Sequence, residues 1–335
     1  MPYTGNTSEK LNLGIIGVGH LGRIHSSLAA QSEAIQLVGV FDVDRERAAK
    51  VGEECRTQAF DHLDDLLRVA QAVCVVVPTS EHYPVAMQAL ESDCHVFLEK
   101  PIATTVKEAR EIVLKGRKRG KKIQVGHIER FNPAMLAIKD YPLAPMFIEA
   151  HRLTEFNPRG CDVSVILDLM IHDLDHVLFI VQSPVREVHA CGVGVVSDSE
   201  DIANVRLTFA NGCVANLTSS RISLTSMRKM RLFQRNQYIA VDFLEKKSEI
   251  FKLQPPKTDA EPDNFSMVVS RIGTEGNARD IVYEKPSIPD VNSLQLELEE
   301  FARAVLHDHE PEVTGEQGQW VLETASRILE NIKRA

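Results

Sequence analysis

The sequence predicts an α/β protein with a doubly wound parallel sheet in its first half and a second domain after it. The chain has 335 residues, a length that suits two domains better than one. Strand-like and helix-like segments alternate through the first half, as they do in a parallel sheet covered by helices. The segment 72–77 is continuously apolar, as expected for a strand buried on both faces of such a sheet.

The first element is a strand at 11–16 that runs directly into a GxGxxG pattern, followed by a helix expected over about 21–31. The first glycine allows a tight turn, the second lets the backbone approach a pyrophosphate, and the third lets helix and strand pack closely. The positive N-terminus of the helix would receive the phosphates. The predicted cofactor-binding residues of this turn are Gly17, Gly19, His20, Leu21 and Gly22.

The second strand, 36–41, ends at Asp42, about 20 residues past the last glycine. A carboxylate there can bind both ribose hydroxyls and would repel a 2′-phosphate, so the sequence favours NAD over NADP. Arg45 follows closely and is a candidate partner for a 2′-phosphate, which keeps NADP open. Asp42 is also a candidate N-cap of the helix expected from residue 44, and the two roles are compatible.

The strand and helix pattern continues to the end of the first half. Strands are expected at 72–77, 95–98 and 123–126, and helices at about 81–91 and 105–119, the second with Thr104 or Thr105 as N-cap. Glu99 and Lys100 follow the strand 95–98. Charged residues at the carboxyl end of a parallel strand lie in the crevice where such sheets bind ligands. Burying them costs free energy unless they are paired or take part in function, so an exposed Glu-Lys at a strand exit is the alternative.

The composition excludes several classes of protein. The hydrophobic fraction of 44% and the charged fraction of 25% are typical of globular proteins, and no apolar stretch approaches the ~20 residues that cross a bilayer. Residues 1–10 lack the apolar core of a signal peptide. The six cysteines have no CxxC spacing, which predicts free thiols, a cytoplasmic protein and no metal framework. The net charge of −9 argues against nucleic acid, whereas an anionic small substrate would need a local basic patch.

In the second half, the segment 166–181 has the apolar spacing of a helix, and Asp168, His172 and Asp175 fall together on a neighbouring face. This arrangement suits a general base, because a carboxylate fixes the tautomer of the imidazole and stabilises the imidazolium. More often, an aspartate and a histidine at this spacing form a solvent-exposed pair with no catalytic role. Asp168, His172 and His176 together suggest a metal site, but no HExxH motif or cysteine ligand supports it.

The glycine turn, the pattern Pro-Thr-x-x-His at 78–82 and the tripeptide Glu99-Lys100-Pro101 occur in this order. Together they resemble the glucose–fructose oxidoreductase/inositol dehydrogenase (Gfo/Idh/MocA) family over nearly the whole chain. The resemblance implies a Rossmann domain followed by an α+β domain with a large, mostly antiparallel open sheet. It also implies NAD as the cofactor, which would be contacted by Pro78, Thr79, His82, Glu99 and Lys100.

The same resemblance implies the catalytic residues. Lys100 would contact the reacting hydroxyl, Glu99 would bind near the nicotinamide ribose, and Pro101 often follows a cis peptide in this family. The Asp-x-x-x-His signature of the family falls on Asp168 and His172, which would form the acid–base group, and the family needs no metal. Lys100 and His172 are expected to come from different domains and to act on one carbinol.

Three later segments, 126–133, 157–173 and 231–236, are similar to the bacterial UDP-N-acetylglucosamine 3-dehydrogenases. Such enzymes oxidise the 3-hydroxyl of the sugar to a ketone during the synthesis of amino-sugar precursors of lipid A. A dehydrogenase of UDP-N-acetylglucosaminuronate, or of a free polyol or sugar, is the alternative. A regulatory protein that binds NAD(H) without turnover is opposed by the set of Lys100, Asp168 and His172, since a sensor needs no base beside the nicotinamide.

Arginines suit the diphosphate of a nucleotide sugar because a guanidinium offers paired donors. Candidates near the open face of the substrate domain are Arg130, Arg152, Arg159, Arg221 and Arg228, with ordinary solvated sheet residues as the alternative. His127 and Asn132 are candidate hexose contacts, and Glu129 has no assigned role. The predicted substrate-binding residues are Lys100, His127, Arg130, Asn132, Arg159, Asp168, His172 and Arg221.

The predicted domains are an NAD-binding domain at 1–128 and a domain for substrate binding and oligomerisation at 129–335. The second domain is expected to contain strands at 187–194, 203–209, 213–222, 230–233 and 238–243, a hairpin turn at 210–212, an exposed loop at 252–264 and helices at 293–305 and 315–332. Helices on one side of this sheet would leave its other face uncovered. A homo-oligomer, either a dimer or a tetramer, is therefore expected to form through the sheet.

Overall fold

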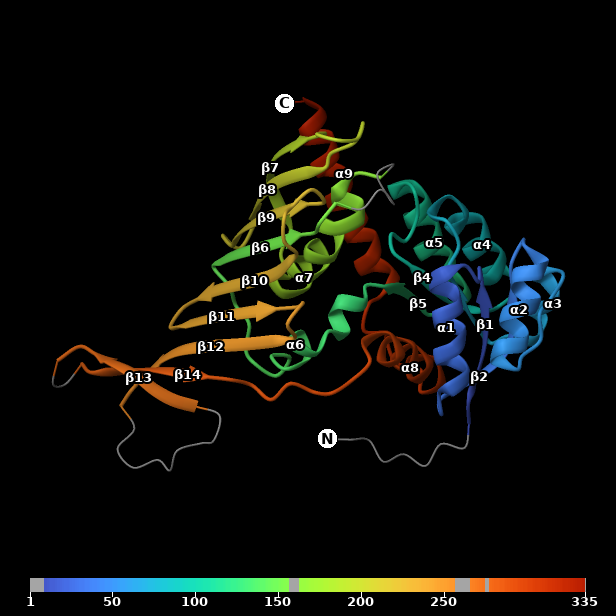
Figure 1. Ribbon diagram of the computed structural model, residues 1–335, viewed down its shortest axis with the longest axis horizontal. Coiled ribbons are helices and arrows are strands. Elements are labelled where there is room, and N and C mark those ends of the chain that lie inside the picture. Colours follow the sequence, from blue (N-terminus) through green and yellow to red (C-terminus); the bar gives the residue numbers. More distant parts are fainter. Residues whose placement is uncertain (1–8, 157–162, 257–265, 275–276, 335) are drawn as a thin grey trace. The chain divides into compact units, whose positions relative to one another are not determined.

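The computed structural model describes residues 9–156, 163–256, 266–274 and 277–334 (Figure 1). The chain forms two compact units. The first contains the chain up to Ile128 together with Asn292–Glu323, and the second contains Glu129–Val291 together with the chain from Thr324 onward. The division after residue 128 coincides with the predicted boundary, whereas residues 292–323 group with the first unit rather than with the second, where the sequence pattern places them.

The first unit is built on a five-stranded parallel sheet with the strand order β2-β1-β3-β4-β5, so the predicted doubly wound parallel sheet is confirmed (Figure 1). Its strands are β1 (Leu11–Ile16), β2 (Ile35–Phe41), β3 (Ala72–Val75), β4 (His95–Glu99) and β5 (Ile123–Gly126). Its helices include α1 (His20–Gln31), α2 (Arg45–Cys55), α3 (Leu63–Val69), α4 (Thr79–Glu91), α5 (Val106–Arg119) and α8 (Ser293–Leu306). The strand order reverses between β1 and β3, and parallel sheets bind ligands at the carboxyl ends of the strands at such a point.

The core of the first unit explains why residues from late in the chain belong to it. Phe97 of β4 is fully buried and packs edge-on against Phe301 of α8, with 5.8 Å between the ring centroids. Leu298 and Ala302, from the same helix, join side chains of β1 and β2 in one buried apolar cluster. An amphipathic helix must bury its apolar face, and α8 does so on this sheet.

The second unit contains a nine-stranded sheet with the order β13-β14-β12-β11-β10-β6-β9-β8-β7. Its strands are β6 (Phe147–Leu153), β7 (Val185–Val193), β8 (Ile202–Phe209), β9 (Val214–Ser220), β10 (Met227–Gln234), β11 (Gln237–Asp242), β12 (Lys247–Gln254), β13 (Ser266–Ile272) and β14 (Arg279–Glu284). Neighbouring strands are antiparallel except β6 and β9, which confirms the large, mostly antiparallel open sheet. The remaining helical elements are η1 (Ile128–Phe131), α6 (Pro133–Leu136), η2 (Ile166–Met170), α7 (Ile171–Val181) and α9 (Gly315–Arg334).

The two faces of the nine-stranded sheet differ in what covers them. Ile148 of β6 and Met230 of β10 are buried on the face along which α7 lies (Figure 1). The opposite face carries a line of partly exposed aromatic rings, the aromatic row, whose centroids lie 5.0 to 6.0 Å apart. The aromatic row consists of Phe147, Phe233, Tyr238, Phe251 and Tyr283. Within the part of the chain that the structure describes, no helix is both long and apolar enough to span a membrane.

Candidate active site

The turn between β1 and α1 has the geometry of a phosphate-binding turn. Gly17 has a φ of +83°, and a Cβ there would lie 2.6 Å from the carbonyl oxygen of Val76. A Cβ at Gly22 would lie 1.9 Å from the carbonyl oxygen of Gly17, so glycine is required for α1 to begin this close to the turn. A Cβ at Gly19 would meet no atom within 4 Å, and no side chain caps α1 there. This open, uncapped helix N-terminus fits the pyrophosphate of NAD.

Asp42 lies at the end of β2, as predicted, and is almost fully buried. Its Oδ2 accepts the N–H of Val18 at 2.8 Å, and its Oδ1 accepts the N–H of Asp44 at 2.9 Å. The carboxylate therefore ties the end of β2 to the glycine turn. The cap of α2 is Asp44 rather than Asp42, because Asp44 Oδ1 accepts the N–H of Arg47 at 3.1 Å.

Sequence reasoning missed an arginine that lies against this carboxylate. Arg47 Nη1 lies 3.3 Å from both carboxylate oxygens of Asp42. Arg45, the candidate for a 2′-phosphate, instead lies 3.5 Å from Asp61. No motif marks Arg47, because the first turn of α2 is what brings it back to the end of β2.

Glu99 is the last residue of β4 and Lys100 follows it, and the peptide bond between Lys100 and Pro101 is cis. Glu99 Oε1 lies 2.9 Å from Nε2 of His25, a fully buried residue of α1, and Glu99 Oε2 accepts the N–H of Lys100 at 3.2 Å. On another side, a Cβ at Gly126 would lie 3.0 Å from Oε2. The carboxylate is thus fixed at the carboxyl end of the sheet, and its pairing with His25 explains how its burial is tolerated.

Two histidines hold this end of the sheet together. His25, which sequence reasoning missed, also lies 3.6 Å from Cys74 Sγ through Nδ1. The available signal was a histidine three residues after Gly22, on the face of α1 that packs against the sheet. His82, a predicted cofactor contact, has Nδ1 2.9 Å from the carbonyl oxygen of Pro101 and Nε2 3.1 Å from that of Val77. Burial lowers the pKa of His82, although these backbone contacts act in the opposite direction.

The helix predicted over 166–181 has two parts, the π-helical turn η2 and the α-helix α7. Single π-helical turns within helices are frequent at functional sites. Asp168 and His172 are partly exposed, whereas Asp173, Asp175 and His176 are buried. Asp168 and His172, four residues apart across the junction, are therefore the members of this group that a ligand can reach.

Asp175 contacts a different residue from the one that the helical pattern suggests. It forms a buried ion pair with Arg130, with Nε 2.6 Å from Oδ2 and Nη2 2.9 Å from Oδ1. His172 and Asp175 both lie within α7, but Arg130 engages both carboxylate oxygens of Asp175. Arg130 was expected to bind substrate. Its Cζ also lies 3.8 Å from the ring centroid of Phe179, and the residue has almost no exposed surface. The structure therefore makes Arg130 a partner of α7.

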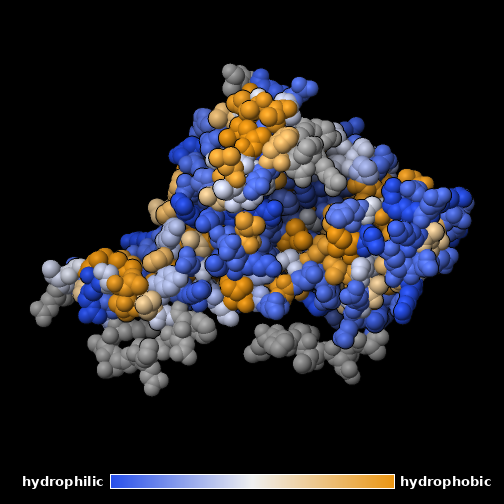
Figure 2. All heavy atoms as spheres, viewed as in Figure 1, coloured by the Kyte–Doolittle hydropathy of each residue, from blue (hydrophilic) through white to orange (hydrophobic). Residues whose placement is uncertain are grey.

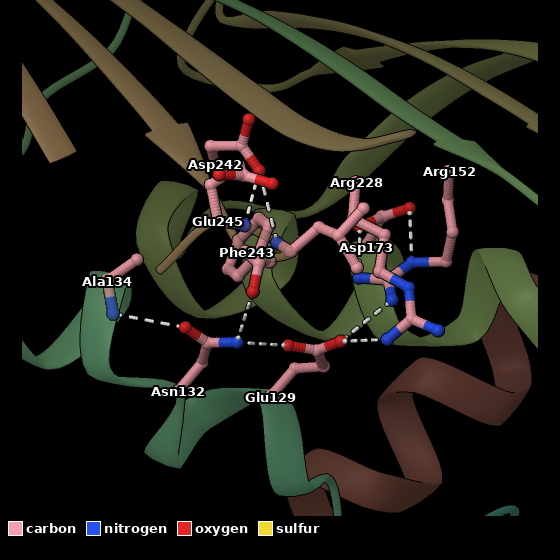
Figure 3. Close-up of polar contacts among 10 residues, drawn as sticks. Glu129, Asn132, Ala134, Arg152, Asp173, Arg228, Asp242, Phe243 and Glu245 are labelled. Atoms are coloured by element: carbon pink, nitrogen blue, oxygen red, sulfur yellow. Dashed lines mark hydrogen bonds and ion pairs between the residues drawn. The ribbon is translucent and has the colours of Figure 1, made fainter. Parts of the chain in front are cut away.

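A second buried ion cluster involves the residue that follows His172 (Figure 3). Arg152 of β6 donates from Nε and Nη2 to Asp173 at 3.0 and 2.9 Å, and from Nη1 to Glu129 at 2.8 Å. Asn132 donates to the other oxygen of Glu129 at 2.9 Å, and Arg228 of β10 lies 3.6 Å from Glu129. We call these five residues the Arg152 cluster. Against the effect of burial, the carboxylates raise the pKa of Arg152, and Arg152 lowers that of Glu129.

The other predicted substrate residues have varied surroundings. Asn132 Oδ1 accepts the N–H of Ala134 at the start of α6, and its amide binds the carbonyl oxygen of Phe243 at 3.1 Å, so it links parts of the fold instead of facing a ligand. Arg221 is nearly buried and donates to the carbonyl oxygen of Val163. His127 is buried after β5. Arg159 lies outside the described residues.

The metal site considered for His176 can be compared with the geometry. His176 is fully buried and its ring stacks on Phe243, with 4.9 Å between centroids. Among the residues that the structure describes, no group of three His, Cys, Asp or Glu side chains is arranged to hold a metal ion.

Comparisons with known proteins match both units. Residues 11–127 match the model of an oxidoreductase family with an NAD-binding Rossmann fold, and residues 145–236 match that of the GFO/IDH/MocA C-terminal domain. The chain is 41% identical over 242 residues to a UDP-N-acetylglucosamine 3-dehydrogenase of Acidithiobacillus ferrooxidans, which covers 72% of this chain and 77% of that protein. It is 27% identical over 230 residues to an inositol 2-dehydrogenase of Rubrobacter xylanophilus, covering 64% of this chain and 66% of that protein.

A solved structure extends the similarity to the whole chain. The UDP-N-acetylglucosamine 3-dehydrogenase GnnA of Acidithiobacillus ferrooxidans matches with a TM-score of 0.85 and 34% sequence identity, covering 97% of this chain and 99% of that one. The glycine turn and Asp42 thus belong to an NAD-binding domain. With both of its parts matched, the chain belongs to the GFO/IDH/MocA family of oxidoreductases.

Proposed function

We propose that the protein oxidises the 3-hydroxyl of UDP-N-acetylglucosamine to a ketone, with NAD as the cofactor. The substrate class is supported by the 41% identity to a UDP-N-acetylglucosamine 3-dehydrogenase. The structural observation that carries the proposal is the exposure of Asp168 and His172, where the neighbouring Asp173, Asp175 and His176 are buried. Partial exposure of this carboxylate and imidazole is what a general base needs.

The proposed chemistry gives each residue one task. NAD, which the glycine turn and Asp42 would hold, would supply the hydride acceptor for the carbinol carbon. His172 takes the proton of the hydroxyl, and Asp168 fixes the tautomer of the imidazole and stabilises the imidazolium. Lys100 donates a hydrogen bond to the reacting oxygen and stabilises the alkoxide that forms there. Glu99, held by His25 at 2.9 Å, binds near the nicotinamide ribose.

We also infer that the protein is a cytoplasmic homo-oligomer, a dimer or tetramer, that supplies amino-sugar precursors of lipid A. The described cysteines are free, as is usual in a reducing compartment. The aromatic row gives the uncovered face of the sheet a surface that a second copy would bury. Figure 2 shows further hydrophobic side chains gathered on the β13–β14 hairpin, which an oligomer would also cover. The exposed apolar residues of β13 are Met267, Val268, Val269 and Ile272.

The variant His172→Ala tests the proposed reaction. We expect kcat for NADH formation from UDP-N-acetylglucosamine to fall by about 10²-fold or more, because a general base typically contributes that much. The affinity for NAD, measured by titration of protein fluorescence, should be kept. UDP should raise the melting temperature of the wild type, since a ligand that binds the folded state stabilises it.

Other outcomes would contradict the proposal. Turnover of a free polyol without turnover of any UDP-sugar would assign the protein to a different substrate class. Turnover of UDP-N-acetylglucosaminuronate alone would move the substrate to the related uronate. No NADH formation from any of these compounds would favour a regulatory NAD(H)-binding protein. Loss of folding in His172→Ala would make the histidine structural, and His172→Asn, which keeps a polar side chain of similar size, distinguishes that case.

A further inference from the structure

Arg228 differs from the other described arginines on the covered side of the nine-stranded sheet. Arg130 and Arg152 are buried and form short charge-assisted hydrogen bonds with carboxylates. The side chain of Arg228 is 40% exposed. Among the described residues, its ion-pair partner is Glu129, at 3.6 Å, which is longer than a hydrogen bond. Its Nε is buried, and no acceptor in the described part of the chain reaches it.

Glu129 holds Arg228 in place without using its donors. Arg152 and Asn132 already donate to both oxygens of Glu129, at 2.8 and 2.9 Å. Arg152 also donates to both oxygens of Asp173. Arg228 adds the second positive charge that balances the two carboxylates, yet no carboxylate oxygen in the cluster depends on it for a hydrogen bond. Apart from the buried Nε–H, the N–H donors of its guanidinium are therefore not committed to a carboxylate oxygen of the cluster and can serve another acceptor.

Arg228 lies beside the part of the sheet where Arg152 binds the side chain of Asp173. Arg228 pairs in register with Arg152 across β10 and β6. The alternation along β10 puts it on the same face as the buried Met230 and Leu232, the face along which α7 lies. Figure 3 shows Arg228 and Arg152 converging on Glu129 beside Asp173, the residue next to His172.

We propose that Arg228 binds the diphosphate of the nucleotide-sugar substrate. This inference rests on the proposed function, because it assigns a substrate contact within the same reaction. A planar guanidinium with paired free donors matches two phosphate oxygens at once. The charge of Glu129 holds the side chain close to one position, which reduces the conformational entropy lost on binding. Arg130, buried in its pair with Asp175, cannot offer this contact.

The test compares the binding of UDP, uridine and NAD to the wild-type protein and to Arg228→Gln by calorimetry. We expect the Kd for UDP and for UDP-N-acetylglucosamine to rise about tenfold or more, the scale of a lost hydrogen bond to a charged group. Binding of uridine, which has no phosphate, and of NAD should stay unchanged. In turnover, KM should rise with little change in kcat, because the contact lies away from the reacting carbon. Arg228→Lys should be intermediate, since it keeps the charge but not the paired donors.

A matched control lies three residues along the same strand. Arg231 is 46% exposed and lies 3.0 Å from Glu149, but it is on the opposite face of the sheet. Arg231→Gln should therefore leave the Kd for UDP unchanged. The mass of this variant in solution shows whether the proposed homo-oligomer still forms.

Each remaining outcome decides one question. If Arg228→Gln binds UDP as tightly as the wild type does, the proposed role of Arg228 is wrong and the proposed function still stands. No binding of any UDP-sugar by the wild type would overturn the proposed function itself. A loss confined to UDP-N-acetylglucosaminuronate would assign Arg228 to a carboxylate and refute the diphosphate contact. If Arg228→Gln fails to fold, Arg228→Lys decides, and UDP binding equal to that of the wild type would count against the proposal.

Discussion

Replacing Arg152 with Met should destabilise the second unit strongly. The change removes three charge-assisted hydrogen bonds of 2.8, 2.9 and 3.0 Å from two carboxylates. The side chains of Glu129 and Asp173 are only 9% and 3% exposed, so they would stay behind as buried charges. Asn132 still donates to Glu129, whereas Asp173 loses both of its Arg152 donors. Removing one partner of a buried ion pair costs about 3–5 kcal/mol, and we expect a loss of this size in the free energy of unfolding.

Unfolding in urea, followed by far-ultraviolet circular dichroism, measures this loss. Fluorescence of the single tryptophan, Trp320, is a second probe, from the part of α9 that belongs to the first unit. Arg231→Met removes an exposed ion pair from the same sheet and should cost only about 0–1 kcal/mol. Adding Asp173→Asn to Arg152→Met should recover part of the loss, because an amide is cheaper to bury than a carboxylate. If Arg152→Met were no less stable than Arg231→Met, the two carboxylates would not depend on Arg152 and the reasoning would be refuted.

Two further predictions concern the two units separately. Gly126→Ala puts a Cβ 3.0 Å from Glu99 Oε2 and should lower kcat by about tenfold to 10²-fold through displacement of the carboxylate. The far-ultraviolet circular dichroism spectrum is the control for folding, and an unchanged kcat would be the contrary result. Burial lowers the pKa of His176 to about 4, below the ~6.5 of an unfolded histidine. Protonation therefore favours the unfolded chain, so this contribution to stability is complete above about pH 6.5 and is lost as the pH falls toward 4. His176→Phe keeps a ring against Phe243 and should make the melting temperature depend less on pH across this range. An equally steep dependence of the melting temperature on pH in the variant would contradict the role of His176.

The first unit could be predicted from the sequence because its signals are local. Each strand from β1 to β5 is a short apolar run beside a helical segment, and the glycine turn and Asp42 lie at fixed distances along the chain. Thr105, one of the two expected caps, forms a capping box with Glu108 in α5. The return of α8 to this unit had no local signal, because an amphipathic helix does not reveal which sheet will cover it.

The second unit was harder to predict because its strands are mixed in polarity and several pair across long sequence separations. The strands β6, β13 and β14 were not expected, nor was β12, whose last residues fall in the segment expected to be an exposed loop. Residues 257–264 of that loop lie outside the described part of the chain. The predicted hairpin turn was found between β8 and β9, where Asn211 and Gly212 provide a recognisable signal.

The charged residues of the candidate site show the limit of reading charge alone. The sequence does not distinguish Arg130 from Arg228. In the structure, Arg130 is buried against Asp175, whereas Arg228 is partly exposed beside Glu129. Burial and pairing depend on residues from other strands and helices, so neither could be read from the arginine's own segment. Asp168 and His172 could be singled out in the sequence because both lie in one segment with helical spacing, which the structure divides into η2 and α7, and their catalytic role stays a prediction.

Residues 292–323 are made after the whole of Glu129–Val291, yet they complete the first unit. Chains generally fold domain by domain from the N-terminus as the ribosome releases them. Here the nascent sheet of β1–β5 emerges with the surface around Phe97 still lacking Phe301, and it stays unfinished while the entire second unit is translated. A chain that stops before α8 would therefore carry a complete glycine turn on a sheet that lacks one of its helices, which makes the nucleotide-binding unit one of the last parts of the molecule to mature.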